Sequence, residues 1–432
     1  MGEKLKNLLL VFLGLLMAVL FVVNLTLGLE GEGLSALRRN FALGQEHVAA
    51  DTGDDSQAAI LPAKVAVRGP SGLYLAAGEG VRELLGAVSP ILSEALGSVE
   101  EIHAVSEQEF LDALSGWGVS VGFTFDVPFS MLQHLWTGET GFSAEQAVTT
   151  LAVVSMEEQA ALVFRDGGSG RCYLAQTAAS YERLYDQCAA APAANAFYAF
   201  EKDGYQMLAP CEAVWSEPVY YPVYQAVSPD FSAEGVVSEG LLSAFGINPF
   251  LAEVYKESNG DIIYIEGYVA LRFGKDGLLH YSASGGGGID LRLAEGLSER
   301  ELRDAAARQT HALLERVAAA AGCTGDFSVS GVESRGSGRY VIAFEQMLGG
   351  GFVTDPDGDS AVVTVEQGRV TAIRLRLRSC TAAGQTMILP TALAISLLEG
   401  TENHLYVRYT EQNGTLTPGL YSMRGGMSDG ME

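Results

Sequence analysis

Four acidic side chains late in the sequence have the spacing of a calcium-binding loop. Positions 1, 3, 5 and 12 of an EF-hand loop, which supply carboxylate ligands, fall on Asp355, Asp357, Asp359 and Glu366. Position 6 of such a loop needs glycine for a sharp turn, and here it is Ser360. The residues after the loop alternate as strands do, whereas an EF-hand continues as a helix. We therefore interpret the segment as an acidic turn between strands, with calcium binding as the weaker alternative.

Catalytic motifs are absent from the sequence. The six histidines include no two that are three or four residues apart, so a zinc-binding histidine pair on one helix face is missing. The chain has neither the G-x-S-x-G elbow of α/β-hydrolases nor the S-x-x-K of penicillin-binding proteins. A catalytic triad could still assemble from distant residues, but no local pattern points to one. We therefore predict that the protein is not an enzyme and uses no cofactor.

The five cysteines lack the C-x-x-C spacing of zinc and redox motifs. Because their number is odd, at least one thiol must stay free or pair between chains. Disulfides between Cys323 and Cys380, or between two of the first three cysteines, are chemically allowed outside the cytoplasm. The simpler interpretation is a set of buried free thiols. The full set is Cys172, Cys188, Cys211, Cys323 and Cys380.

The overall charge excludes one large class of function. The chain has a net charge of −26, whereas nucleic-acid binding needs a basic surface. Such an acidic surface also repels anionic lipid headgroups. With 48% hydrophobic and 19% charged residues, the composition is that of a folded protein. We therefore predict a folded protein with no nucleic-acid partner.

An uncharged apolar run over residues 8–29 predicts a transmembrane helix. At 1.5 Å per residue it covers the roughly 30 Å hydrocarbon core of a bilayer. Lys4 and Lys6 precede it, which favours a cytoplasmic head at residues 1–7 and an extracytoplasmic position for the rest. A cleaved signal peptide is the alternative, but its apolar core is shorter, and no A-x-A site follows here. We therefore predict a single-pass protein of the cell membrane.

The predicted span also contains residues of the kind found where transmembrane helices associate. Gly14 and Ala18 are four residues apart, and Asn24 lies near the outer end. Small residues at this spacing let two helix backbones approach closely, and a polar side chain can form a hydrogen bond between helices. We take these three residues as a hypothetical membrane-helix interface. The alternative is that they are ordinary residues of a single span.

The exported part divides into a linker and three predicted domains. Residues 30–60 are rich in glycine and acidic side chains, which predicts a linker. Short strands alternating with short helices over 61–215 predict a first α+β domain. Four β-rich segments separated by turn residues predict a β-meander domain over 216–290. Residues 291–432 predict a second α+β domain, so the expected fold class is α+β with antiparallel sheets and short helices.

Local signals are clearest in the last domain. Ser298 and Glu301 form the capping box of a helix that ends at Gly322, and His311 lies opposite Leu302 on that helix, so we expect it to face solvent. A second helix is expected over 390–399. Hairpins are expected at the turns Gln367-Gly368 and Asn413-Gly414.

Residues 240–284, GLLSAFGINPFLAEVYKESNGDIIYIEGYVALRFGKDGLLHYSAS, resemble the YycH family. The shared pattern is a short helix with Asn-Pro, an aromatic strand with Arg272, and a Lys-Asp-Gly turn before Tyr281. The stretch from Ser298 through ILPTALAISLL and LYVRYTEQNGTLTPGLYSM is similar to the closing domain of YycH and its sister YycI. The resemblance implies that this last domain has a PepSY-like arrangement.

The resemblance also implies a function. The YycH family consists of membrane-anchored regulators of a two-component sensor histidine kinase in Gram-positive bacteria. By resemblance, the partners of this chain are a sensor histidine kinase and a YycI-like sister protein, contacted in and outside the membrane. A second hypothesis is an extracytoplasmic binding module for a cell-wall or peptide ligand.

Overall fold

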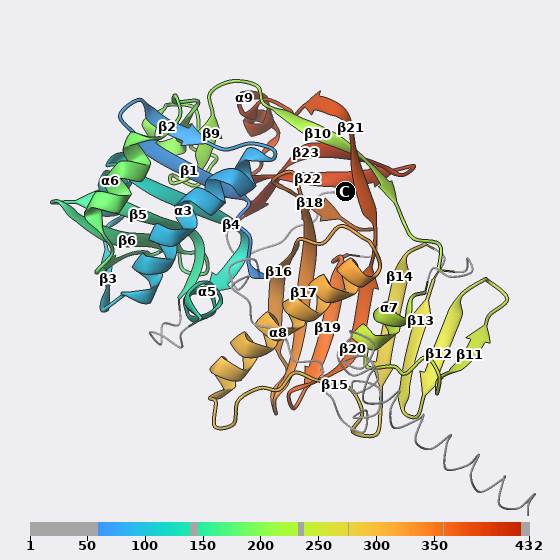
Figure 1. Ribbon diagram of the computed structural model, residues 1–432. Coiled ribbons are helices and arrows are strands. Elements are labelled where there is room, and N and C mark those ends of the chain that lie inside the picture. Colours follow the sequence, from blue (N-terminus) through green and yellow to red (C-terminus); the bar gives the residue numbers. More distant parts are fainter. Residues whose placement is uncertain (1–58, 139–145, 232–236, 275, 357, 425–432) are drawn as a thin grey trace, which may run out of the picture. The chain divides into compact units, whose positions relative to one another are not determined.

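The computed structural model describes residues 59–138, 146–231, 237–274, 276–356 and 358–424 (Figure 1). The chain divides into two units, Met1–Ala49 and Ala50–Glu432, and every described residue belongs to the second. The predicted head, the predicted span and most of the predicted linker therefore lie outside the described residues. The last two residues of that linker, Ala59 and Ile60, are buried in the core.

The first sheet is built from the residues of the predicted first domain. Within the described residues it has nine strands, all antiparallel, in the order β3-β7-β6-β5-β4-β1-β2-β8-β9. The strands are β1 (Lys64–Gly69), β2 (Gly72–Leu75), β3 (Glu101–Val105), β4 (Gly118–Pro128), β5 (Ala147–Met156), β6 (Gln159–Asp166), β7 (Cys172–Gln176), β8 (Ala196–Tyr198) and β9 (Ala213–Trp215).

Helices cover this sheet on both faces. Successive side chains of a strand point to opposite faces, and here both sets are apolar and must be buried. On the central strand β5, Leu151 and Val153 belong to one buried cluster, and Ala152 and Val154 belong to another. The first cluster includes residues of α3 (Gly80–Gly97), α5 (Phe129–Thr137) and α6 (Tyr181–Ala189). The second includes Phe110 of α4 (Glu107–Ser115). Because both faces are buried, β5 is apolar along most of its length.

A second, mixed sheet begins at residue 220. Its path is β11-β12-β13-β14-β20-β19-β17-β18-β22-β23-β10-β21, with β15 beside β20 and β16 beside β17. One pair in it, β18 with β22, is parallel. The strands are β10 (Tyr220–Val227), β11 (Glu253–Lys256), β12 (Ile262–Glu266), β13 (Val269–Phe273), β14 (Leu278–Ala283), β15 (Ile289–Asp290), β16 (Phe327–Ser334), β17 (Arg339–Leu348), β18 (Gly351–Thr354), β19 (Ala361–Glu366), β20 (Arg369–Arg376), β21 (Ser379–Met387), β22 (Asn403–Gln412) and β23 (Thr415–Arg424).

The predicted meander is part of this larger sheet. Strands β11 to β14 follow one another as expected, with positive φ at Gly260, Gly267 and Gly277 in the turns. Strand β14 then pairs with β20, with Tyr281 opposite Ile373. The sheet therefore crosses the domain boundary that the sequence predicted at residue 290. This pairing could not be predicted from local patterns, because the two strands are about 90 residues apart in the chain.

The long helix α8 (Glu299–Ala320) begins with the predicted capping box of Ser298 and Glu301, and Gly322 follows its end with φ of 65°. The expectation for His311 was wrong, because this side chain is only 6% exposed. The physical reason is that α8 packs against β16 on one side and against α5 and α7 (Glu239–Ala244) on others. A helix with neighbours on several sides buries residues that an amphipathic pattern assigns to solvent.

The C-terminal hairpins form as their turns predict. Gln367 and Gly368 connect β19 to β20, and Asn413 and Gly414 connect β22 to β23, all with positive φ. This is the turn geometry that matches the twist of a hairpin. The helix expected over 390–399 is shorter: α9 spans Thr391–Ala394 and continues as one 3₁₀ turn, Ile395–Leu397.

Candidate functional site

The residues proposed for the membrane-helix interface, Gly14, Ala18 and Asn24, lie outside the described residues. Among the helices that the structure describes, none has both the length and the hydropathy needed to cross a bilayer.

The described acids of the calcium-loop candidate each have a partner of their own. Asp355 is buried, with its carboxylate against the Arg378 guanidinium and 3.3 Å from that of Arg376. The Asp359 carboxylate accepts a hydrogen bond of 3.2 Å from Ser330, and Glu366 lies on β19, 3.2 Å from Arg339. Asp357 lies outside the described residues. No three His, Cys, Asp or Glu side chains of the described segments are grouped so that they could hold a metal ion.

A buried group of charges joins three distant parts of the chain. The Glu212 carboxylate contacts the Lys64 ammonium and lies 2.9 Å from Nδ1 of His404, and it accepts the backbone N–H of Leu405 at 2.9 Å. Burial on its own raises the pKa of Glu212, but Lys64 and His404 outweigh it and lower that pKa to about 2. Although the residue types are those of catalysis, each of Lys64, Glu212 and His404 is at most 8% exposed. We therefore assign this group a structural role.

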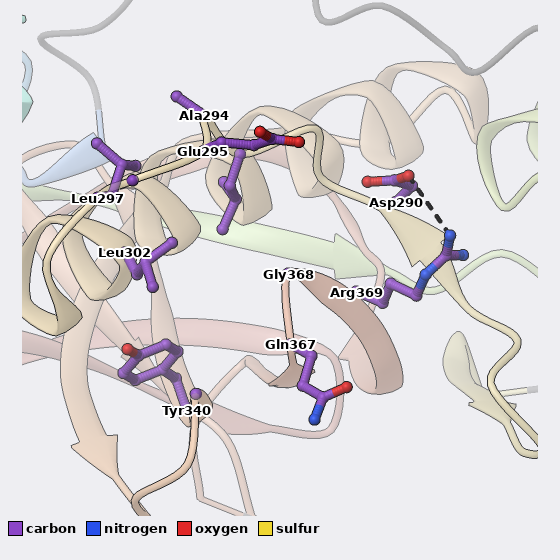
Figure 2. Close-up of a pocket in the computed structure, with 12 residues that line it drawn as sticks. Asp290, Ala294, Glu295, Leu297, Leu302, Tyr340, Gln367, Gly368 and Arg369 are labelled. Carbon is purple, nitrogen blue, oxygen red and sulfur yellow. Dashed lines mark ion pairs between the residues drawn. The ribbon is translucent and has the colours of Figure 1, made fainter.

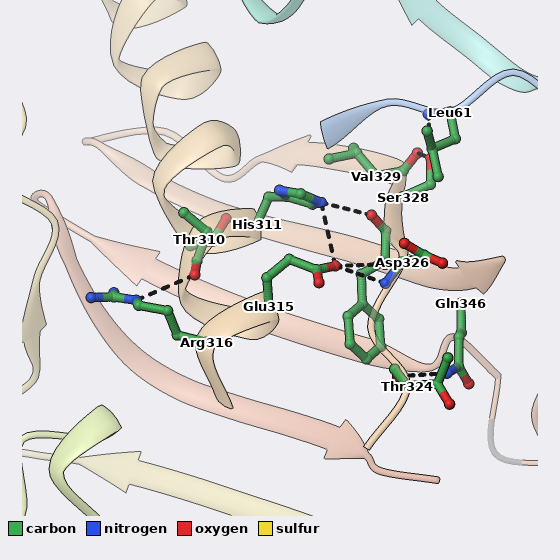
Figure 3. Close-up of polar contacts among 12 residues, drawn as sticks. Leu61, Thr310, His311, Glu315, Arg316, Thr324, Asp326, Ser328, Val329 and Gln346 are labelled. Atoms are coloured by element: carbon green, nitrogen blue, oxygen red, sulfur yellow. Dashed lines mark hydrogen bonds and ion pairs between the residues drawn. The ribbon is translucent and has the colours of Figure 1, made fainter. Parts of the chain in front are cut away.

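Figure 3 shows a second group of polar contacts, which joins α8 to the residues at the start of β16. Nε2 of His311 donates to the backbone oxygen of Phe327 at 2.8 Å, and the Glu315 carboxylate accepts the backbone N–H groups of Asp326 and Phe327 at 3.0 and 2.9 Å. Burial raises the pKa of Glu315. Asp326 also forms an ion pair with Arg82 of α3. This ion pair links the start of β16 to a helix that covers the first sheet.

A pocket of about 520 Å³ lies beside the first turn of α8 (Figure 2). Its apolar wall includes Leu293, Leu302 and the ring of Tyr340. At one end Arg369 and Asp290 form an ion pair of 3.5 Å. An apolar wall with a charged pair at its end suits a small amphipathic ligand.

The meander ends in an exposed apolar surface, which we call the meander edge. β11 is the edge strand at one end of the second sheet (Figure 1). All four of its residues are exposed. A hydrogen bond of 2.7 Å from the backbone of Asn248 to Glu266 holds the preceding loop near the turn between β12 and β13. The meander edge consists of Phe250 (81% exposed), Leu251 (69%), Val254 (56%), Tyr255 (49%) and Tyr268 (72%).

The composition of the meander edge is that of a protein-binding surface. Exposed aromatic side chains are enriched where proteins bind one another, and a polar rim surrounds such centres. Here Glu253 and Lys256 flank the two apolar residues of β11. Among the described strands β11 pairs with β12 alone, so its other edge can offer backbone groups to a strand of a partner. The sequence identified these strands, but only the fold shows that their apolar residues stay exposed.

The five cysteines are free thiols. Three of them are buried, and burial raises the pKa of Cys188 and Cys211 to about 12. Thiols with such a high pKa are poor nucleophiles at neutral pH.

Comparisons with known proteins identify the fold. No family model matches the chain, and no curated protein matches its sequence. The crystal structure of YycH from Bacillus subtilis superimposes with a TM-score of 0.54 at 10% identity, covering 85% of this chain and 97% of that one. The structure of an uncharacterized protein from Eubacterium rectale gives a TM-score of 0.31 at 14% identity, covering 48% and 77%. The chain therefore has a YycH-like fold.

Proposed function

We propose, from its YycH-like fold, that this protein is a membrane-anchored extracytoplasmic regulator of a two-component sensor histidine kinase. The single observation that carries the proposal is the match to YycH over 97% of that chain. The proposed partners are the sensor kinase and a YycI-like sister protein. Residues 8–29 would hold the protein in the cell membrane, and the last domain would be its PepSY-like part.

Regulation of this kind needs no catalytic group. A regulator that contacts one state of the kinase more tightly than the other changes the populations of the two states. A difference of a few kcal/mol in contact free energy is enough to change signalling output strongly. The meander edge supports this proposal, because its exposed Tyr268 and Val254 lie on a surface suited to protein contact. Gly14, Ala18 and Asn24 are the proposed contact within the membrane.

An in-membrane two-hybrid assay of the full chain against the sensor kinase and the sister protein from the same genome tests the proposal. We expect Val254→Glu combined with Tyr268→Glu to lower the signal at least tenfold, because two charges would be buried against the partner. Ala189→Glu combined with Ala319→Glu, which adds the same two charges at exposed positions of α6 and α8, is the control and should keep the full signal. Replacing residues 8–29 by a poly-leucine span tests the membrane contact separately. No signal with either partner would contradict the proposal.

The pocket in Figure 2 supports a second candidate function, a binding module for a cell-wall or peptide ligand. A peptide carboxylate would compete with Asp290 for Arg369. Soluble muropeptides should then raise the melting temperature of the protein, and Arg369→Ala should abolish that increase. If no muropeptide changes the melting temperature, this alternative fails.

A further inference from the structure

Three runs of this acidic chain have no charged residue and no histidine: residues 218–229, 379–398 and 412–423. Since 19% of the chain is charged, runs of this combined length would on average carry about eight charged side chains. The fold brings the runs together, because β23, β10 and β21 are neighbours in the second sheet and α9 follows β21 (Figure 1). We call this region the charge-free surface.

Large apolar side chains are exposed at one end of the charge-free surface. Tyr220 of β10 pairs with Met387 of β21, and they are 62% and 48% exposed. Three leucines spaced four residues apart continue from there through α9: Leu389 (40% exposed), Leu393 (57%) and Leu397 (69%). Soluble surfaces seldom gather so many apolar side chains unless something covers them.

The lack of charge indicates that a lipid bilayer covers the charge-free surface. A chain of net charge −26 is repelled by anionic headgroups wherever its acids face them. The charge-free surface has no acid in its own three runs, so these runs can approach such headgroups without that cost. Its leucines and methionine suit the acyl boundary, and a tyrosine suits the headgroup level. The meander edge differs, because charged residues flank the apolar pair of β11, as a polar rim does in protein interfaces.

The length of chain before the described residues also favours the bilayer. The predicted span ends at Leu29, and the described chain begins at Ala59, with 29 residues between them. A linker of this length has a root-mean-square span of roughly 30 Å. A protein tethered so closely encounters the bilayer at high effective concentration.

We propose that the charge-free surface rests on the outer face of the membrane, with Leu393 and Leu397 inserted at the acyl boundary. This inference rests on the membrane anchor of the proposed function. Two attachments, the span and this surface, limit the rotation of the exported part about its tether, so that the meander edge meets its partner in a restricted set of orientations.

Quenching by brominated lipid tests the inference in the full-length protein. Leu393→Trp and the control Tyr255→Trp are reconstituted in vesicles of phosphatidylethanolamine and phosphatidylglycerol, with and without dibrominated phosphatidylcholine. We expect the added emission of Leu393→Trp to fall at least twofold with brominated lipid. The emission of Tyr255→Trp, on the meander edge, and of the native tryptophans should not change.

Flotation of the same vesicles tests the membrane anchor separately from the contact of the charge-free surface with the bilayer. Protein that floats without selective quenching of Leu393→Trp keeps the anchor but overturns the inference, and then a protein partner becomes the occupant of this surface. Equal quenching of both variants also overturns it. Protein that does not float contradicts both the anchor and the membrane contact.

Discussion

At the scale of single residues, the buried Glu212 makes the strongest prediction. Burial raises its pKa, but Lys64 and His404 outweigh burial and lower that pKa from its ordinary value of 4.5 to about 2. A depressed pKa stabilises the fold above the unfolded value, and this stabilisation is lost as the pH falls from about 4.5 to about 2. We expect Glu212→Gln to lower the free energy of unfolding at neutral pH by about 3–5 kcal/mol, because the buried Lys64 ammonium loses its counter-charge and keeps only its hydrogen bond to the backbone oxygen of Ala213. Urea unfolding from neutral to acid pH measures both effects.

The matched control is Glu217→Gln, at an exposed glutamate five residues further on, which should change stability by less than about 0.5 kcal/mol. If Glu212→Gln unfolds like the wild type, or keeps the wild-type loss of stability in acid, the assignment of a structural role to this group is wrong.

At the scale of elements, the hairpin between β17 and β18 depends on its close approach to α3. Gly350 has φ of 74°, and a Cβ there would lie 2.6 Å from both the backbone oxygen of Gly78 and Cγ2 of Val81. Gly336 has nearly the same φ, 75°, but nothing lies within 4 Å of its Cβ position. Both alanine variants carry the cost of a positive φ, but only Gly350→Ala must also displace α3. We therefore expect Gly350→Ala to be less stable than Gly336→Ala by about 1–3 kcal/mol, as measured by urea unfolding. Equal stabilities would show that the hairpin can move away from α3 without cost.

At the scale of the whole molecule, the net charge of −26 predicts how salt affects stability. Like charges repel one another in the compact state, and added ions screen this repulsion. We expect the melting temperature to rise when sodium chloride increases from about 0.02 M to about 0.5 M, which shortens the Debye length from roughly 20 Å to roughly 4 Å. Potassium chloride should give the same curve, because screening depends on ionic strength. A melting temperature that falls with salt would mean that ion pairs such as Arg408 with Glu345 outweigh the general repulsion.

The amino-acid sequence alone determined the features that depend on neighbouring residues. The capping box at Ser298, the turns at Gln367-Gly368 and Asn413-Gly414, and the meander strands all follow from contacts within a few positions of the chain. The resemblance to YycH, seen in the same local patterns, was confirmed at the level of the fold.

The tertiary structure alone decided which distant residues meet. It buried His311 between several elements, paired β14 with β20, and placed Glu212 against Lys64 and His404. It also placed the strands of three uncharged runs, separate in sequence, side by side in the second sheet. Periodicity and turn residues report the local backbone, whereas these contacts depend on strand order and on which faces of an element are covered, and no short stretch of sequence encodes either.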